Sequence, residues 1–345
     1  MPVHELDAVL LSELTTLRLG GPARRLAEVD KPDELVEAVR SADAVGDPVL
    51  ILGGGSNLVV GDAGFDGTVI KVATTGIHVQ ASTDLVAVTA QAGEDWDPLV
   101  STAIDEGWAG LEAMSGIPGL VGATPIQNVG AYGQEVAETV TSVTAYDRAA
   151  GEVTVLQPAD CAFSYRNSAL KGNDRYVVID VTYTLARSGQ SRPVRYQELA
   201  RALDAEIGDQ VPAAAVRAAV LGLRRRKGMV LDPNDPDATS AGSFFTNPIV
   251  PAEVAARLPV EVPRWPAPDG QVKVSAAWLI ERAGFAKGYG HGAARISTKH
   301  TLALTNRGGA TTAELLALAR ELRDGVQAKF GITLVNEPVL IGATF

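Results

Sequence analysis

Three polar residues far apart in the sequence have side chains suited to anion binding and proton transfer. Arg166 stands next to Tyr165 shortly before a predicted strand, and a guanidinium there can hold a carboxylate or a phosphate. Ser243 precedes two phenylalanines, and its hydroxyl can donate a proton, although the G-x-S-x-G elbow of an acyl-transfer nucleophile is absent. Glu337 is a single carboxylate near the carboxyl-terminal end. A surface arginine, a serine in a turn and a solvated acid are the alternatives.

Two glycine-rich segments can bring the backbone close to a ligand. The first, Gly53-Gly54-Gly55-Ser56-Asn57, follows an apolar run, so its amide groups stand at a strand end with few side chains in the way. It matches neither the G-x-G-x-x-G nor the G-x-x-x-x-G-K-[ST] fingerprint. It is either a loop that wraps a pyrophosphate or a tight turn.

The second segment, 116–133, holds five glycines and two prolines in eighteen residues. This composition argues against a regular helix. With so little side-chain bulk, its amides can line a flat ligand closely. A long irregular surface loop is the alternative.

Hydrophobic patterning predicts the elements that position these residues. The first part of the chain alternates a strand at 25–29, a helix with Pro32 in its first turn and a buried strand at 49–52. Asp95 is a cap candidate for a helix at 96–106. Stretches rich in β-branched residues predict further strands at 85–90, 140–146, 153–156 and 176–185.

The later part of the chain contains clear helix signals. We expect a helix at 211–226, a helix at 276–283 capped by Ser275, and a helix after the capping box Thr311-x-x-Glu314. A final strand is predicted at 332–335. The Asp- and Pro-rich segment 232–237 is the best candidate for a linker or flexible loop.

Composition excludes several classes of protein. The chain has 345 residues, of which 46% are hydrophobic, so disorder over most of its length is excluded. Its 41 acidic against 30 basic residues argue against nucleic acid as a partner. The single cysteine, Cys161, excludes an internal disulfide, and the scattered histidines predict no metal site. No apolar run reaches the ~18 residues of a membrane span, and the start lacks a signal-peptide layout, so we expect a cytoplasmic protein without a membrane partner.

The motifs, taken in their order and spacing, resemble those of the UDP-N-acetylenolpyruvoylglucosamine reductases, flavin enzymes of peptidoglycan precursor synthesis. The resemblance covers nearly the whole chain. It rests on the motifs at 16–21, 52–58, 116–119, 125–133, 165–168 and 242–248.

This resemblance implies an α+β chain with an FAD-binding fold of the vanillyl-alcohol-oxidase type. The expected FAD-binding subdomains are 1–72 and 73–228. The expected α/β substrate-binding domain is 229–345, whose last strand returns Glu337 to the active site. The family further implies non-covalent FAD, NADPH as co-substrate, a sugar-nucleotide substrate and a monomeric enzyme.

The resemblance also implies roles for individual residues. Arg166 matches the arginine that stabilises the substrate carboxylate, Glu337 its assisting acid, and Ser243 the proton donor to C2. The residues expected to bind FAD are Gly53, Gly54, Gly55, Ser56, Asn57, Gly116, Pro118, Gly119, Gly122, Ala123, Gln127, Asn128, Gly130, Ala131, Tyr132 and Arg166. Those expected to bind the substrate are Tyr165, the mobile Tyr196, Arg224, Lys227, Asn247 and Lys287.

The chain departs from the family pattern at Thr15, at Val335-Asn336 and at Lys299-His300, where some members have amides. Two other functions stay open. One is a related flavin oxidase or dehydrogenase that acts on an alcohol, although neither His78 nor Cys161 lies in a motif for covalent flavin attachment. The other is a non-catalytic nucleotide-binding protein on the same fold.

Overall fold

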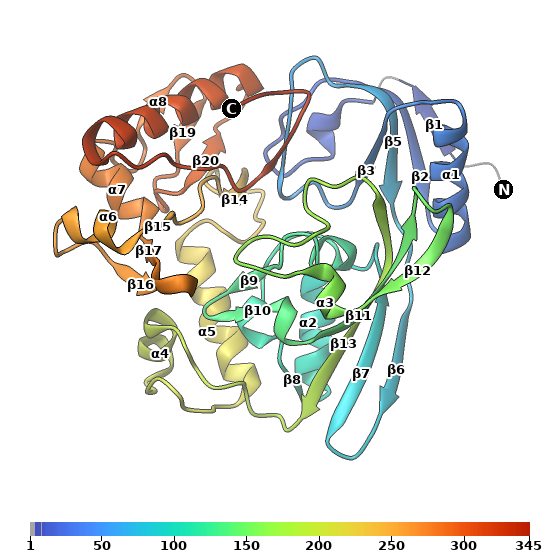
Figure 1. Cartoon of the computed structure of the whole chain (residues 1–345), viewed down its shortest axis with the longest axis horizontal. Coiled ribbons are helices and arrows are strands. Elements are labelled where there is room, and N and C mark those ends of the chain that lie inside the picture. Colours follow the sequence, from blue (N-terminus) through green and yellow to red (C-terminus); the bar gives the residue numbers. More distant parts are fainter. Residues whose placement is uncertain (1–3, 8) are drawn as a thin grey trace. The chain divides into compact units, whose positions relative to one another are not determined.

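The computed structural model describes residues 4–7 and 9–345, which divide into two compact units (Figure 1). The first contains the described residues before Leu10 together with Ala23–Gly55 and Asp66–Arg226. The second contains Leu10–Pro22, Ser56–Phe65 and Lys227–Phe345. Two short segments from the first part of the chain thus belong with the carboxyl-terminal part. The division into subdomains 1–72 and 73–228 and a domain 229–345 stays a prediction.

A small mixed sheet of the first unit has the strand order β1-β2-β5-β3. Its strands are β1 (His4–Asp7), β2 (Ala23–Val29), β3 (Val49–Leu52) and β5 (Phe65–Val72). Helix α1 (Pro32–Ala44) follows β2 and buries Leu35 and Val39 in the core. It begins at the predicted proline, because the first turn of a helix leaves its N–H groups unpaired in any case.

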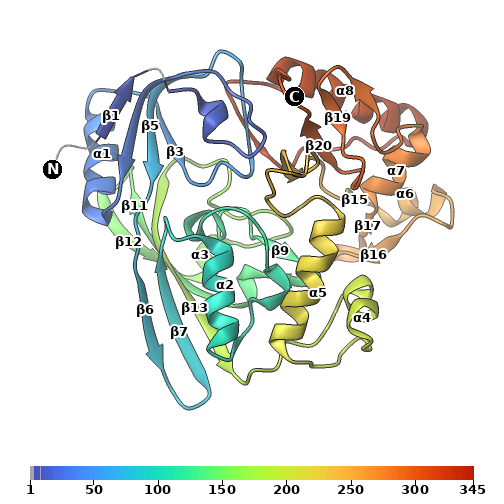
Figure 2. The same ribbon diagram turned by 180° about the vertical axis from the view of Figure 1, so that it is seen from behind.

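The larger sheet of this unit has the order β12-β11-β13-β7-β6, with β8 beside β13, and all its pairs are antiparallel. The strands are β6 (Ile77–Ala81), β7 (Leu85–Gln91), β8 (Trp108–Ala109), β11 (Val140–Asp147), β12 (Glu152–Leu156) and β13 (Tyr176–Arg187). Helix α2 (Trp96–Asp105) lies on one face of the sheet (Figure 2). The centroid of the Trp96 ring lies 5.7 Å from that of Tyr183. Asp95 is at its N-cap, but its side chain makes no capping hydrogen bond.

Further helices and short strands complete the first unit. They are η2 (Glu112–Met114), η3 (Val121–Ala123), β9 (Gly130–Ala131), β10 (Gln134–Glu135), η4 (Val136–Glu138), α3 (Pro158–Cys161), α4 (Gln197–Leu203) and α5 (Ala213–Arg226). Helices α4 and α5 share a small apolar core built on Leu199, Val220 and Leu223. The predicted irregular course of 116–133 is confirmed, because this segment contains only a 3-10 turn and a two-residue strand.

The second unit contains two small antiparallel sheets and a parallel pair. One sheet has the order β14-β20-β19-β18 and the other β15-β17-β16, while β4 pairs with β21. The strands are β4 (Leu58–Val60), β14 (Ser240–Ser243), β15 (Ile249–Val250), β16 (Arg264–Pro266), β17 (Val272–Val274), β18 (Gly290–His291), β19 (Ala294–Ile296), β20 (Ala303–Asn306) and β21 (Val339–Ile341). The helices are η1 (Leu11–Glu13), α6 (Ala252–Arg257), η5 (Pro268–Gly270), α7 (Ala276–Ala283) and α8 (Thr312–Phe330).

Both predicted caps of α7 and α8 are confirmed. The Ser275 hydroxyl accepts a hydrogen bond from the Trp278 amide, and Thr311 and Glu314 form the reciprocal capping box. Each cap pairs N–H groups that the first helical turn cannot pair internally. The two helices then bury Leu279, Leu315 and Leu322 in the core of the second unit.

Two expectations from the sequence are wrong. Residues 332–335 form no strand, although Ile332 and Leu334 are buried and alternate with exposed neighbours; the nearby strand is β21. An extended chain has this alternation even without a ladder partner. The segment 232–237 is not a linker between the units, because it lies within the second unit and is held there by Asp237, whose carboxylate accepts hydrogen bonds from Thr298.

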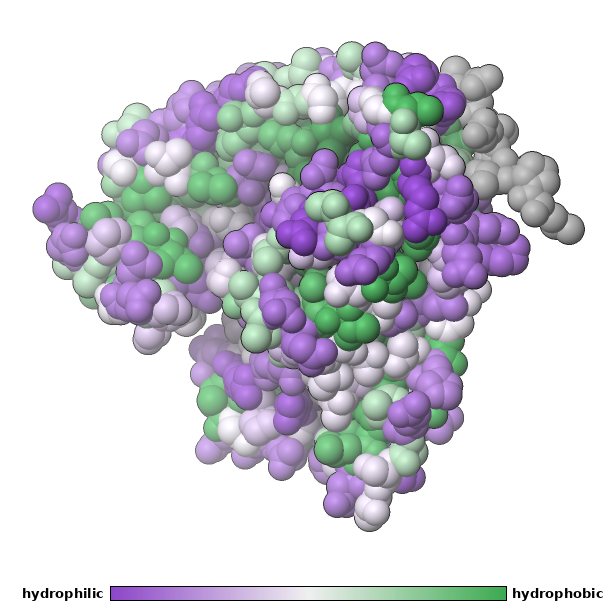
Figure 3. Space-filling model, turned by 45° about the vertical axis from the view of Figure 1, so that its right-hand side comes forward, coloured by the Kyte–Doolittle hydropathy of each residue, from purple (hydrophilic) through white to green (hydrophobic). Residues whose placement is uncertain are grey.

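None of the helices that the structure describes combines the length and low polarity that crossing a membrane demands. The face drawn in Figure 3 carries hydrophilic and hydrophobic residues side by side.

Candidate functional site

In the first unit, the glycines of the first glycine-rich segment lie against the second segment. A Cβ on Gly54 would stand 3.0 Å from the Cα of Gly119, and one on Gly53 would stand 3.5 Å from the Leu120 side chain. The β3 strand delivers the first segment, and the amide of Trp96 fixes the second by donating to the Gly119 carbonyl at 3.0 Å. Two loops of small residues therefore present their backbones at one place, as a phosphate or flat ligand requires.

The start of segment 116–133 is clamped between two charged side chains. The Gly116 amide donates to Asp97 at 2.6 Å, and its carbonyl accepts from Arg224 Nε at 3.2 Å. Burial opposes the charge of Asp97, but hydrogen bonds from Arg217 and Gly116 hold the pKa of its carboxyl below the ordinary value. Burial lowers the pKa of the Arg224 guanidinium to about 10. Arg224, predicted to bind substrate, thus also orders the start of this loop.

The end of the segment forms a tight polar loop beneath Arg166. The buried amide of Asn128 donates to Glu135 and to the Ser164 carbonyl, at 2.8 and 2.9 Å, and its oxygen accepts from the Ala137 amide. Asn128, Tyr132 and Arg166 have φ values of 46°, 47° and 53°. Residues other than glycine adopt this conformation rarely, and they cluster at active sites and ligand clamps.

The Arg166 side chain lies along this loop. Its guanidinium donates to the carbonyls of Gly130 and Asn128, at 2.5 and 3.5 Å, and stands 3.6 Å from the Glu135 carboxylate. The Tyr165 ring lies under it at 5.3 Å. Held on several sides, the guanidinium is a fixed positive group beside the predicted flavin loop.

Tyr196, the predicted mobile tyrosine, begins α4 and packs edge-on against Tyr132, with ring centroids 5.6 Å apart. Burial raises the pKa of Tyr132 to about 12 and also raises the pKa of Tyr196, so both phenols are neutral. The pair links a predicted substrate residue to the predicted flavin loop.

In the second unit, the backbone segments that carry Ser243 and Glu337 are joined by a hydrogen bond and an isolated bridge. Ser243 ends β14 opposite Ala303, directly after Gly242, whose φ of 70° suits a residue without a Cβ. The Glu337 amide donates to the carbonyl of Phe244, the residue after Ser243, at 2.8 Å. Phe244 and Phe245 point into the core, where they fix this strand end.

His300 is a polar neighbour of Ser243 that our sequence reasoning did not assign to the site. Its Nε2 lies 3.3 Å from the serine Oγ. The two residues are 57 positions apart, so no local sequence pattern could predict their contact. The sequence drew attention to His300 only because Lys299-His300 departs from the family pattern.

The other predicted residues occupy varied surroundings. The side-chain oxygen of Asn247 accepts a hydrogen bond from the amide of Ala276 at the start of α7. Lys287 is exposed after α7, and Lys227 follows α5 and is half-buried.

Gly122, a predicted FAD residue, is buried against Ala92, where a Cβ would clash at 2.5 Å, so its lack of a side chain serves packing. The remaining predicted FAD residues lie in the two glycine-rich segments: Gly55, Ser56, Asn57, Pro118, Ala123, Gln127 and Ala131.

Two family models match separate parts of the chain. The FAD binding domain family matches residues 23–157, and the family described as UDP-N-acetylenolpyruvoylglucosamine reductase, C-terminal domain, matches residues 233–341.

Relatives align over nearly the whole chain. A UDP-N-acetylenolpyruvoylglucosamine reductase from Thermobifida fusca is 61% identical, over 97% of this chain and 98% of its own. One from Streptomyces coelicolor is 58% identical, over 99% and 91%.

A solved UDP-N-acetylenolpyruvylglucosamine reductase from Thermus caldophilus matches 99% of both chains with a TM-score of 0.67 at 27% identity. The predicted α+β fold with its FAD-binding domain is thereby confirmed. The chain belongs to the family of UDP-N-acetylenolpyruvoylglucosamine reductases.

Proposed function

We propose that this protein reduces the enolpyruvyl group of UDP-N-acetylglucosamine enolpyruvate to give UDP-N-acetylmuramate, a step of peptidoglycan precursor synthesis. Support comes from the family and from one observation above all: the Glu337 amide donates a hydrogen bond to the carbonyl of Phe244, the residue that follows Ser243 at the end of β14. The proposal includes non-covalent FAD, NADPH as co-substrate and a monomeric cytoplasmic enzyme, with no nucleic acid or membrane as a partner. It assigns 1–72 and 73–228 to FAD and 229–345 to the substrate.

The first unit offers a suitable place for FAD. Gly53 and Gly54 approach Gly119 and Leu120 so closely that larger side chains would fill the space between the loops. In our proposal, 53–57 hold the pyrophosphate and 116–133 lie along the ribityl chain and the ring system. FAD, when bound, accepts a hydride from NADPH and passes it to C3 of the enolpyruvyl group.

Negative charge then develops at C2 and spreads into the substrate carboxylate. A fixed cation stabilises such charge without reorganisation. We assign this task to Arg166, because the Gly130 carbonyl and the Tyr165 ring hold its guanidinium in place. Glu337 is the assisting acid, kept in register by the hydrogen bond from its amide to Phe244.

Ser243 supplies the proton to C2. A neutral serine is a weak acid, but a carbanionic centre is a strong base, so the transfer needs chiefly a well-placed hydroxyl. The end of β14 gives Ser243 a fixed backbone, since the buried Phe244 follows it directly.

We propose that substrate binding uses aromatic, cationic and amide side chains. Tyr165 and Tyr196 provide aromatic rings with hydroxyl groups, and cationic side chains suit the diphosphate. The full set is Tyr165, Tyr196, Arg224, Lys227, Asn247 and Lys287.

A Ser243→Ala variant tests the proposal. We expect NADPH to reduce its flavin at the wild-type rate, whereas the enolpyruvyl substrate reoxidises it at least about 100-fold more slowly, because the proton donor is gone. A Ser243→Cys variant keeps an acidic hydrogen at the same place and should recover part of the rate. Anaerobic stopped-flow absorbance measures both half-reactions. Unchanged reoxidation in the alanine variant removes Ser243 from the mechanism.

A further inference from the structure

The hydroxyl of Ser243 lies beside a histidine that has no role in the proposed reaction so far. The Oγ–Nε2 distance to His300 is 3.3 Å, within hydrogen-bonding range. His300 is half-buried, as is Ser243, so neither is sealed in the core. Both belong to one sheet of the second unit, because His300 lies in the connection from β19 to β20 and β20 pairs with β14.

The connection that carries His300 is held by its own hydrogen bonds. The Ser297 hydroxyl, fully buried, accepts from the amides of Lys299 and His300, at 3.0 and 3.1 Å. The His300 carbonyl in turn accepts from the Ala303 amide at 3.0 Å. The backbone of His300 is therefore fixed on both sides.

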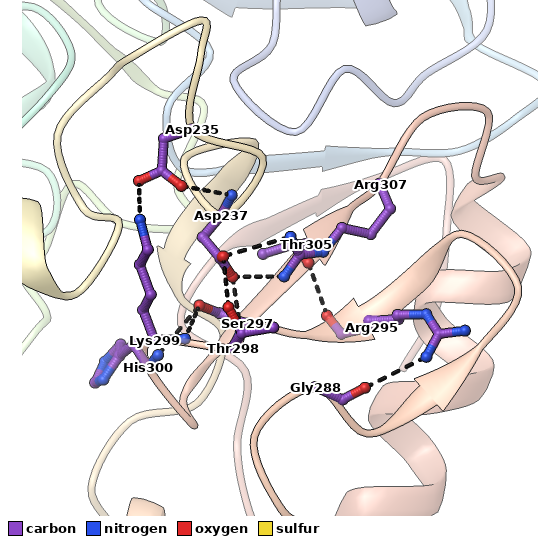
Figure 4. A network of polar contacts seen from close by, with 10 residues as sticks. All are labelled: Asp235, Asp237, Gly288, Arg295, Ser297, Thr298, Lys299, His300, Thr305 and Arg307. Carbon is purple, nitrogen blue, oxygen red and sulfur yellow. Dashed lines mark hydrogen bonds and ion pairs between the residues drawn. The ribbon is translucent and has the colours of Figure 1, made fainter.

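A second layer of contacts ties this connection to the Asp- and Pro-rich segment (Figure 4). Asp237, only 3% exposed, accepts from the Thr298 amide and hydroxyl at 2.7 and 2.8 Å and pairs with Arg307 at 2.5 Å. Asp235 pairs with Lys299 at 2.8 Å. The segment predicted to be a flexible loop thus anchors the residues beside His300.

We propose that His300 is a positioning residue for Ser243, a role that rests on the proposed function. Ser243 must keep its hydrogen for C2, so the Nε2–H of His300 donates and the serine Oγ accepts. This arrangement turns the hydroxyl hydrogen away from the ring and toward the substrate.

The same contact stabilises the charge that forms during transfer. The O–H bond of Ser243 breaks as the C2–H bond forms, and the electron pair of the O–H bond stays on Oγ. The Nε2–H of His300 then donates to an alkoxide instead of a neutral oxygen, which strengthens the hydrogen bond. After the product leaves, a proton from solvent restores the hydroxyl.

A double-mutant cycle on the reoxidation half-reaction tests this role. We expect His300→Ala to slow reoxidation by the enolpyruvyl substrate on the order of 10- to 100-fold. This rate loss is no larger than the loss that follows when one hydrogen-bond donor to an oxyanion is removed. In a Ser243→Ala background, the same change should cost nothing further, because His300 acts through the serine. His300→Gln, whose amide nitrogen can donate from a similar position, should stay within a few-fold of wild type.

Matched controls separate this role from a loss of structure. His291, on exposed β18 of the same sheet, gives a His291→Ala variant that should behave as wild type. NADPH should reduce the flavin of every variant at the same rate.

Any of three results would overturn the role of His300 but not the proposed function. These are a wild-type reoxidation rate in His300→Ala, an equally large rate loss when His300→Ala is added to Ser243→Ala, and a reoxidation rate in His300→Gln as low as in His300→Ala. A wild-type enzyme that the enolpyruvyl substrate fails to reoxidise would overturn the proposed function, and the role of His300 with it.

Discussion

Arg166 combines an unusual backbone conformation with a guanidinium that is held by neighbouring backbone carbonyls. Its φ of 53° is a left-handed backbone conformation that is unfavourable for residues other than glycine. Its guanidinium donates hydrogen bonds to the carbonyls of Gly130 and Asn128. Such strain persists only where surrounding contacts enforce it. The arginine is thus preorganised to meet a carboxylate in one orientation.

This geometry predicts that lysine cannot replace Arg166. An ammonium lacks the planar fork that holds two acceptors at once. We expect Arg166→Lys to slow reoxidation by the enolpyruvyl substrate on the order of 100-fold, comparable to the loss of one oxyanion donor. The surface pair of Arg148 with Asp43 offers the control Arg148→Lys, which should leave the rate unchanged. Equal rates for both variants in stopped-flow absorbance would show that Arg166 has no special role.

At the scale of elements, the connection from β19 to β20 is held by hydrogen bonds to the buried carboxylate of Asp237, which lies in the segment 232–237. Burial opposes the charged form of Asp237, but hydrogen bonds from Ser297, Thr298 and Arg307 outweigh it and hold the pKa of its carboxyl below the ordinary 3.8. A group with a depressed folded pKa stabilises the fold above its unfolded pKa, and this contribution disappears as the pH falls through the folded pKa.

We therefore expect Asp237→Asn to lower the free energy of unfolding at pH 7 by about 3 kcal/mol, the usual cost of breaking a buried ion pair. The difference from wild type should shrink as the pH falls below 3.8. Asp235→Asn breaks a more exposed pair with Lys299 and should cost about 1 kcal/mol or less. Urea unfolding at several pH values measures both, and equal losses for the two variants would refute the anchoring role of Asp237.

Elements with local signals could be predicted from the sequence, while those made by distant partners could not. The Ser275 cap and the Thr311 capping box lie within their own helices and were correctly predicted. The anchoring of Asp237 depends on Thr298 and Arg307, 61 and 70 positions away, so composition alone indicated a flexible loop. The contact of Ser243 with His300 could not be predicted from the sequence for the same reason.

At the scale of the whole molecule, the net negative charge of the chain does not prevent the binding of anionic ligands. The cationic side chains that matter lie beside the predicted ligand loops. The formal charge is −11, yet Arg166 and Arg224 are both buried or half-buried against predicted ligand loops. Local charge and hydrogen bonding decide such binding, whereas net charge governs solubility and association.

Because the proposed FAD is non-covalent, its removal should change stability reversibly. A ligand that binds only the folded state at 100 times its Kd adds about 2.7 kcal/mol of stability. We expect the melting temperature to fall when FAD is removed and to return when it is added back. Acid precipitation should leave the FAD in the supernatant; a yellow pellet would instead indicate a covalent flavin and favour the alcohol oxidase alternative.

The central claim is that the flavin of this protein delivers its electrons to an enolpyruvyl sugar nucleotide. The most direct measurement is anaerobic: NADPH reduces the bound flavin, UDP-N-acetylglucosamine enolpyruvate is then added, and flavin absorbance is followed. We predict that the oxidised spectrum returns and that UDP-N-acetylmuramate forms in an amount equal to the reduced flavin. A flavin that stays reduced after the substrate is added would contradict it.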